Sequence, residues 1–268
     1  MLSRRHLLPV FVLALTLATP SFALANEICC PQIACAPQPD CTCRADYTVD
    51  LDLTVCSKYV WRGLLTVDGF VAQPSIDFSA YGFGLNVWGN LNLEETNGNQ
   101  FKWTELDLTG SYTYSLNKFD FSVGAIAYVF PTLGDQTTEL FAGVTWSIPL
   151  SPTLSVYRDI DVVDGTYVAL SGSYAFDDPF CLGPCRGLSP ELSASIGWGS
   201  DDHNDVYYGS RKSGFADLTL GLSIPYRIST RATIAGSVHW SSLLSEDNRD
   251  ANDDPDNLWF GLGISVSL

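Results

Sequence analysis

The sequence predicts an all-β protein, a transmembrane antiparallel up-and-down β-barrel of about 12 strands. Apolar residues recur at every second position through most of the chain after residue 46, which indicates strands with one apolar and one polar face. Short connections alternate with longer polar ones, and aromatic residues gather near the ends of the expected strands. No segment has a convincing helical period.

The N-terminal 45 residues differ in composition from the rest of the chain. Residues 1–25 are expected to be a secretory signal peptide, because Arg4 and Arg5 precede an apolar run and Ala23-Leu24-Ala25 forms an A-x-A cleavage pattern. An ordinary basic n-region is favoured over a twin-arginine signal. Residues 26–45 are expected to be a Cys/Pro-rich periplasmic leader, and residues 46–268 an outer-membrane barrel. The formal net charge of −16 argues against nucleic acid as a partner and against charge-driven binding to an anionic surface.

The alternation predicts the strands and their two faces. In the fourth expected strand, Leu106 and Leu108 lie on one face while Glu105 and Asp107 lie on the other. A soluble sandwich also alternates, but repeated carboxylates on the polar faces suit a hydrated lumen with the apolar faces turned to lipid. The expected strands lie near 47–61, 72–81, 83–93, 101–114, 119–130, 137–148, 153–158, 165–176, 189–199, 213–224, 230–242 and 257–268.

The connections alternate in length. Short ones are expected at 81–82, 115–118, 149–152 and 226–229, and longer ones at 62–71, 94–100, 131–136, 159–164, 200–212 and 243–256, with 177–188 as an exception on the short side. Outer-membrane barrels have short periplasmic turns and longer outside loops. The pattern therefore predicts the outer membrane of a Gram-negative-type bacterium, with outer-membrane lipid as a partner. The acidic runs 201–205 and 246–256 are expected to be solvated loops.

Aromatic residues are expected to form two belts at the membrane–water interfaces. Those next to the long connections are Trp61, Trp103, Trp198, Trp240 and Trp259, and those at the short turns are Tyr81, Phe83, Tyr114, Phe119, Trp146, Phe176 and Tyr226.

Several segments resemble the TorF-like porin family. They are Ser57-Lys-Tyr-Val-Trp-Arg-Gly63, Gln73-Pro-Ser75, Leu85-Asn-Val-Trp-Gly89, and Ser151-Pro-Thr-Leu-Ser-Val-Tyr-Arg-Asp159 leading into Asp164-Gly-Thr-Tyr167. The resemblance covers most of residues 47–268 and implies an outer-membrane barrel of mostly unproven substrate. The Cys-rich leader and the connection with Cys181 and Cys185 lie outside the family's pattern.

The polar faces predict a set of pore-lining residues, which are Asp50, Asp52, Lys58, Arg62, Asp77, Glu105, Asp107, Glu139 and Asp217, with Lys102 as a further candidate cation. Rings of carboxylates attract cations, so the favoured function is a narrow, charged channel for passive passage of small polar solutes or cations. Barrels of about eight strands are filled and those of 16–18 leave a channel, so an open pore and a polar plug are equally compatible with 12. A non-conducting structural or adhesive barrel is the alternative.

The eight cysteines favour disulfides, because the count is even in an exported chain. Cys181 and Cys185 are the candidate pair for a small loop. A zinc site built on Cys41 and Cys43 is the less favoured interpretation, since no standard ligand spacing is present. No cofactor or metal is predicted. The leader could bind a periplasmic partner, and the sequence does not indicate an oligomeric state.

Two further motifs have spacings that resemble those of functional sites. His239-Trp240-Ser241 has the spacing of a base and nucleophile on one face of a strand, as in an outer-membrane lipid hydrolase. His239 is expected to face the lumen, away from lipid, so catalysis is the least favoured function. Alternate carboxylates in 250–256 resemble a calcium loop without its glycine and closing glutamate, and a disordered acidic loop is favoured.

Overall fold

The computed structural model describes residues 47–96, 98–176 and 187–268. The predicted signal peptide, the Cys/Pro-rich leader and the candidate pair Cys181 and Cys185 lie outside the described residues. Their assignments remain predictions.

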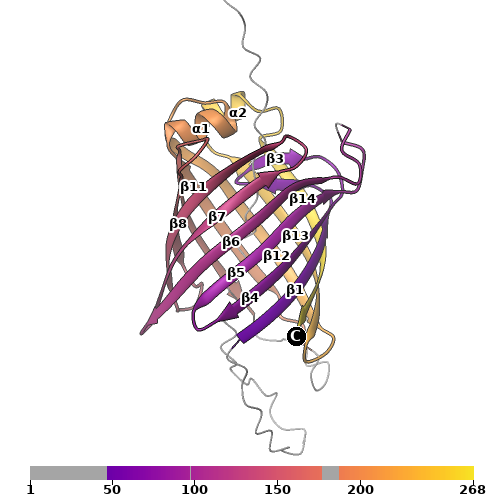
Figure 1. The fold of residues 1–268 in the computed structure, drawn as a ribbon. Helices are drawn as coiled ribbons and strands as arrows, with labels where there is room; N and C mark the ends of the chain where they lie inside the picture. The colour runs from indigo at the N-terminus through magenta and orange to yellow at the C-terminus, as the bar shows by residue number, and fades with distance from the viewer. Residues whose placement is uncertain (1–46, 97, 177–186) are drawn as a thin grey trace, which may run out of the picture.

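The structure confirms the predicted closed antiparallel barrel. Twelve strands close a ring in which β1 pairs with both β4 and β14 (Figure 1). In ring order they are β1 (Tyr47–Cys56), β4 (Val71–Ala80), β5 (Phe83–Asn92), β6 (Trp103–Leu116), β7 (Phe119–Phe130), β8 (Asp135–Trp146), β9 (Thr153–Asp159), β10 (Thr166–Ala175), β11 (Glu191–Gly199), β12 (Gly214–Arg227), β13 (Ala232–Leu243) and β14 (Asp256–Ser267).

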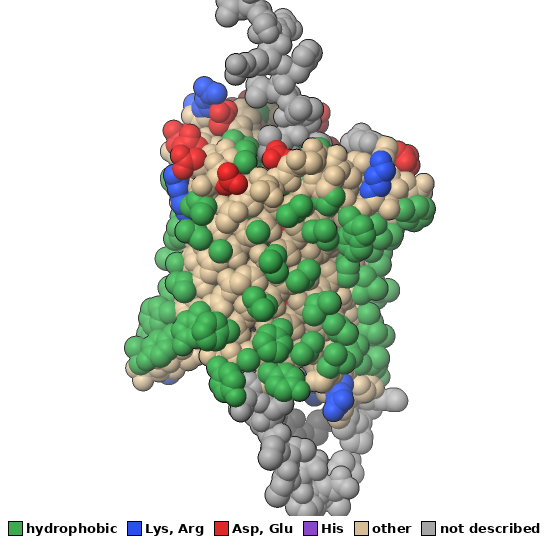
Figure 2. All heavy atoms as spheres, in the orientation of Figure 1, with side chains coloured by type: hydrophobic (Ala, Val, Ile, Leu, Met, Phe, Trp, Pro, Cys, Tyr) green, Lys and Arg blue, Asp and Glu red, His purple; other side chains and the backbone are tan. Residues whose placement is uncertain are grey.

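The register places the apolar face of each strand outward. Leu51, Ile76, Leu85 and Leu108 are each more than a third exposed, although they are large aliphatic side chains. Figure 2 shows hydrophobic side chains over the middle of the wall on the face in view, with acidic and basic side chains at the upper rim and basic side chains at the lower rim. An exposed apolar band between charged rims is the surface that a bilayer covers, and a closed sheet leaves no unpaired edge in it.

The expected strand at 47–61 was wrong in its second half. The wall strand β1 ends at Cys56, and the chain then folds into the barrel as a separate hairpin of β2 (Tyr59–Trp61) and β3 (Leu64–Val67). Its two turn residues, Arg62 and Gly63, have φ values of 43° and 82°, the left-handed geometry of a tight two-residue hairpin turn. We call residues 57–69 the inward hairpin.

The acidic runs expected to be solvated loops contain two helices, α1 (Asp201–Tyr208) and α2 (Glu246–Asp250), which lie above one end of the barrel (Figure 1). Ser200 and Ser245 cap their N-termini by accepting a hydrogen bond from the backbone of the third residue on, and acidic residues occupy both first turns. The run at 201–205 is therefore not a loop, and α2 replaces the first part of the solvated loop expected at 246–256. Within the described residues, neither helix is long and apolar enough to cross a membrane.

Two tryptophans expected at the interface lie inside the barrel instead. Trp61 belongs to the inward hairpin and is 1% exposed. Trp259 alternates inward on β14 and stacks on His239, with ring centroids 5.2 Å apart. Trp103 and Trp240 are exposed near the long connections, and Tyr81, Phe83, Tyr114, Phe119, Trp146 and Phe176 are exposed near the short turns.

Candidate functional site in the barrel lumen

The predicted pore-lining carboxylates separate into two groups along the barrel. Asp50, Asp52 and Asp77 lie toward the end where the strands are joined by short turns, and all three are partly exposed. Glu105, Asp107, Glu139 and Asp217 lie toward the end with the long connections, and all four are buried. We call these regions the short-turn half and the long-loop half.

The lining of the short-turn half is small and polar. Asp77 accepts hydrogen bonds from Asn86 (2.8 Å) and Ser75 (3.2 Å), and it lies directly across from Asp50 in the β1–β4 register. The other inward positions of this half are mostly serine, threonine and glycine, namely Thr109, Ser111, Ser122, Gly143, Ser171, Ser193, Ser195, Gly221, Ser237, Gly261, Gly263 and Ser265.

Arg62 and Glu139 form the centre of the long-loop half. Both terminal nitrogens of Arg62 donate to the two carboxylate oxygens of Glu139 at 2.9 Å, and their side chains are 6% and 2% exposed. The inward hairpin follows β1, whereas Glu139 belongs to β8, five strands away around the ring in one direction and seven in the other. The hairpin therefore reaches across the lumen to the far wall.

Aromatic rings enclose the guanidinium. Its central carbon lies 4.2 Å from the ring centroid of Trp61, 4.8 Å from that of Tyr157 and 4.1 Å from that of Tyr167. The hydroxyl of Tyr128 also donates to Glu139 at 2.8 Å. These rings were not among the predicted site residues, although Tyr128, Tyr157 and Tyr167 occupy polar-face positions on their strands. Cation–π contacts of a desolvated arginine add to the energy of its ion pair.

Further buried carboxylates surround this pair. Tyr59 donates to Glu105 at 2.9 Å, and Tyr167 donates to Asp217 at 2.8 Å. The buried acids of the described residues number five, namely Glu105, Asp107, Glu139, Asp159 and Asp217. Among the described ion pairs, Arg62 is the only arginine or lysine whose side chain is less than a tenth exposed, so buried acidic side chains outnumber buried basic ones at this level of the barrel.

Two glycines permit the close packing. A Cβ on Gly197 of β11 would collide with the hydroxyl of Tyr167 and the carboxylate of Asp217, so glycine lets these two groups meet over β11. A Cβ on Gly63 would lie 2.7 Å from the Cβ of Asp217 and 2.8 Å from a methyl of Leu243, which places the hairpin tip against β12 and β13.

The helix α1 covers the hairpin. The hydroxyl of Tyr208 donates to the backbone carbonyl of Arg62 at 2.7 Å, and Tyr207 packs edge-on to Trp61. His203 is 1% exposed, and its burial, together with the nearby charge of Arg62, holds the pKa of the imidazole well below its ordinary value. His203 is therefore neutral at physiological pH.

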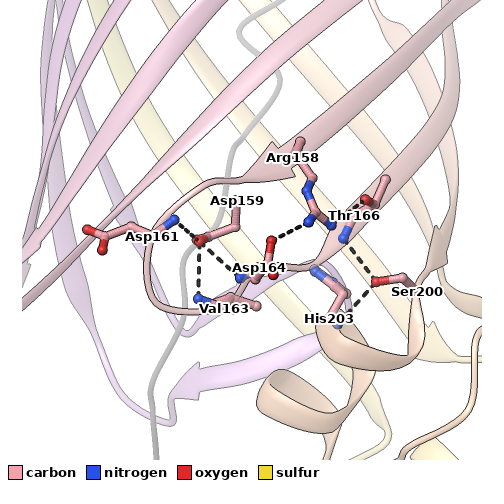
Figure 3. A network of polar contacts seen from close by, with 8 residues as sticks. All are labelled: Arg158, Asp159, Asp161, Val163, Asp164, Thr166, Ser200 and His203. Atoms are coloured by element: carbon pink, nitrogen blue, oxygen red, sulfur yellow. Dashed lines mark hydrogen bonds and ion pairs between the residues drawn. The ribbon is translucent and has the colours of Figure 1, made fainter.

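The connection between β9 and β10 is built around Asp159 (Figure 3). One oxygen of its carboxylate accepts from the backbone N–H groups of Asp161, Val163 and Asp164, and the other accepts from Thr137 at 2.6 Å. Ser200 accepts from the backbone of Thr166 and of His203, so the same network joins this connection to α1 (Figure 3). Asp159 thus serves the loop structure.

Lys58 and Lys102 lie away from the buried acids. Lys58 pairs with Asp68 at 3.0 Å within the inward hairpin, where Asp68 is 67% exposed, and Lys102 donates to the carbonyl of Gly98 at the rim. Among the described ion pairs, neither lysine therefore pairs with these buried carboxylates. Cys56 is buried and is the free cysteine of the described residues.

The other weighed motifs have different partners from those expected. The hydroxyl of Ser241 bonds with Thr219 at 2.9 Å and the carbonyl of Leu218 at 3.3 Å, while His239 stacks on Trp259. The calcium-like segment supplies Asp256 to an ion pair with Arg249 at 2.6 Å. Neither arrangement assembles the site that its spacing suggested.

The closed twelve-stranded barrel, apolar outside and with buried acidic side chains inside, has the fold of several porin structures. The chain is similar to a NanC porin structure, with 10% identity, a TM-score of 0.54, and coverage of 81% of this chain and 100% of that chain. It is similar to the KdgM porin, with 14% identity, a TM-score of 0.53, and coverage of 82% and 99%. KdgM in complex with disordered oligogalacturonate gives 12% identity and a TM-score of 0.52, over 82% and 99% of the two chains.

The chain belongs to the family described as a bacterial protein of unknown function, Gcw_chp, which matches residues 40–178. No curated protein sequence matches the chain. The porin structures are less than 25% identical to it, so they establish the fold, and its solute has to be argued from its own residues.

Proposed function

We propose that the protein is an outer-membrane, porin-like channel for passive passage of small polar solutes or cations. The observation that carries this proposal is the composition of the lumen, where four buried acidic side chains, Glu105, Asp107, Glu139 and Asp217, and one buried guanidinium lie inside a closed barrel with an apolar outer surface. Carboxylates in a narrow, low-dielectric passage attract cations and repel anions. We also propose a location in the outer membrane of a Gram-negative-type bacterium, in agreement with the signal peptide predicted from the sequence and with the resemblance of several segments to TorF-like porins.

Anionic solutes fit this lumen poorly. KdgM was captured with oligogalacturonate, which is a polycarboxylate. A polycarboxylate entering the present barrel would meet the buried acids Glu105 and Asp107, while Arg62 is engaged with Glu139. Among the described ion pairs, the lumen therefore offers a polycarboxylate no buried arginine or lysine that is free to bind it, and we expect the oligogalacturonate seen with KdgM not to be a solute of this chain.

The inward hairpin supports the alternative of a non-conducting barrel. Tyr59, Trp61 and Val67 of the hairpin are buried, and α1 contacts the hairpin at Trp61 and Arg62. A channel interpretation therefore requires either a narrow path beside the hairpin or movement of the hairpin. In both cases we expect the short-turn half, with its small polar lining, to be hydrated.

The test is planar-bilayer recording of the refolded protein under a salt gradient, with selectivity taken from the reversal potential. We expect cation selectivity that decreases when Glu105→Gln and Asp107→Asn are combined. The matched control is Glu94→Gln with Glu95→Gln, which removes two carboxylates from an exposed connection. Silence from a correctly folded, heat-modifiable protein would favour the non-conducting barrel, and anion selectivity would contradict the proposed solute class.

A further inference from the structure

We propose that the lumen wall around Arg62 is a binding site for solutes that carry a guanidinium group, and that Arg62 fills this site while the inward hairpin is in place. This inference rests on the proposed function, because it names the class of solute that the channel would select. The contacts that Arg62 makes with the barrel wall carry the inference.

Most groups that hold the guanidinium belong to the wall. Glu139 is on β8, Tyr128 on β7, Tyr157 on β9 and Tyr167 on β10, and these four strands are consecutive neighbours in the barrel. Of the enclosing rings, only Trp61 comes from the hairpin. Withdrawal or truncation of Arg62 therefore leaves a carboxylate and three tyrosines fixed on a rigid sheet.

The geometry selects a guanidinium over an ammonium. Two parallel N–H to oxygen bonds of 2.9 Å to one carboxylate need a planar, forked donor. The rings of Tyr157 and Tyr167, at 4.8 and 4.1 Å from the central carbon, suit a flat delocalised cation that stacks on aromatic faces. An ammonium ion has neither two parallel N–H donors in one plane nor a flat, delocalised charge.

The surrounding acidic side chains favour entry of another cation. Glu105, Asp107 and Asp217 are buried in the same half of the barrel, on β6 and β12, and none of them has a basic partner among the described ion pairs. Removing Arg62 leaves Glu139 with the hydroxyl of Tyr128 and no cation. An unpaired buried carboxylate is costly, so a cation of the right shape that restores the pair is stabilised there. In the native chain, such a solute competes with Arg62.

The test is chemical rescue of Arg62→Ala. Thermal unfolding of the detergent-folded protein is followed with methylguanidinium chloride at millimolar concentrations, and with urea or sodium chloride at equal concentration. Urea is a planar, neutral analogue of guanidinium and controls for shape without charge. We expect methylguanidinium alone to raise the Tm of Arg62→Ala saturably, by about 2–4 °C at several times its Kd.

Two controls locate the effect. The native protein should show no such rise in Tm, because Arg62 occupies the site. Arg62→Ala combined with Glu139→Gln should show none either, because the carboxylate that accepts both N–H groups of a guanidinium is gone. Arg158→Ala removes an exposed rim arginine whose side chain is 46% exposed, and it should gain nothing from the ligand. If Arg62→Ala does not fold, Arg62→Gln takes its place, since it keeps a planar side chain without the charge.

An unchanged Tm of Arg62→Ala or Arg62→Gln with methylguanidinium, or an equal response to urea or to sodium, would overturn the inference. The readout does not depend on conduction. A silent barrel that still shows selective rescue would refute the proposed channel and keep the site, whereas a conducting barrel without rescue would keep the channel and refute the site.

Discussion

The two halves of the barrel share one strand pattern and differ in the size and charge of their inward side chains. The short-turn half is lined by serine, threonine and glycine around the partly exposed Asp50, Asp52 and Asp77. The long-loop half holds Tyr128, Tyr157 and Tyr167 around a buried ion pair and a hairpin that crosses the lumen. The same sheet therefore has a small polar lining at one end and a packed centre with a buried ion pair at the other.

Stability and the proposed selectivity both depend on the long-loop half of the barrel. Buried ion pairs and tight packing make substitutions costly, whereas partly hydrated polar side chains tolerate change. Substitutions in the long-loop half should therefore cost more stability than substitutions in the short-turn half.

Glu139→Ala is expected to be the most destabilising single change, by about 3–5 kcal/mol, because it leaves the Arg62 guanidinium buried without its partner. Urea unfolding of the detergent-folded protein, followed by tryptophan fluorescence, measures the loss. Combining Arg62→Met with Glu139→Leu removes both charges and should recover most of the stability. A loss of stability below about 1 kcal/mol for Glu139→Ala, the size expected of an exposed ion pair, would contradict a buried ion pair between Arg62 and Glu139.

Gly197→Ala is expected to cost about 1–3 kcal/mol, because the added methyl group collides with the bond between Tyr167 and Asp217. Gly236→Ala on β13 is the matched control, since a Cβ there meets nothing within 4 Å, and its unfolding midpoint should stay close to that of the native protein. Equal effects of the two substitutions would show that the packed half is looser than described.

His203 is expected to make the docking of α1 sensitive to acid. Its folded-state pKa is lowered, so the unfolded chain takes up a proton near pH 6.5 while the folded protein does not. Stability from this group is complete above pH 6.5 and falls by about 1.4 kcal/mol per pH unit below it, until the folded pKa is reached. The difference in unfolding free energy between the native protein and His203→Phe, measured from pH 7.5 to 5, should show this slope, and parallel curves would refute it.

Asp77→Asn is expected to change stability by less than about 1 kcal/mol, because the asparagine keeps an acceptor for Asn86 and removes repulsion from Asp50 across the strand pair. The same urea titration measures it. A cost approaching that of Glu139→Ala would remove the distinction between the halves.

The sequence predicted the barrel because twelve strands carry a period of two through almost their whole length. The alternation of side chains between the two faces of each strand was enough to place Glu105, Asp107, Glu139 and Asp217 on the inner face. It did not predict the inward hairpin. Residues 57–61 continue the alternation of β1, and a period of two does not show whether a strand stays in the wall. The pair Arg62-Gly63, a candidate tight turn, was the available signal.

The aromatic enclosure and α1 were missed for different reasons. Tyr157 and Tyr167 occupy inward-facing positions of the alternation, but this alternation cannot reveal that an arginine remote in sequence lies between them. The helix α1 has eight residues, too few for a clear helical period, and only the cap at Ser200 followed by Asp201 and Asp202 marked its start.

The most direct test of the central claim is single-channel conductance of the native protein, Arg62→Ala and Asp77→Asn, recorded under identical conditions. If the passage is limited where Arg62 crosses to Glu139, Arg62→Ala should conduct severalfold more than the native protein, and Asp77→Asn should conduct as the native protein does. Equal conductance of all three would contradict a constriction in the long-loop half, and so would a larger effect of Asp77→Asn than of Arg62→Ala.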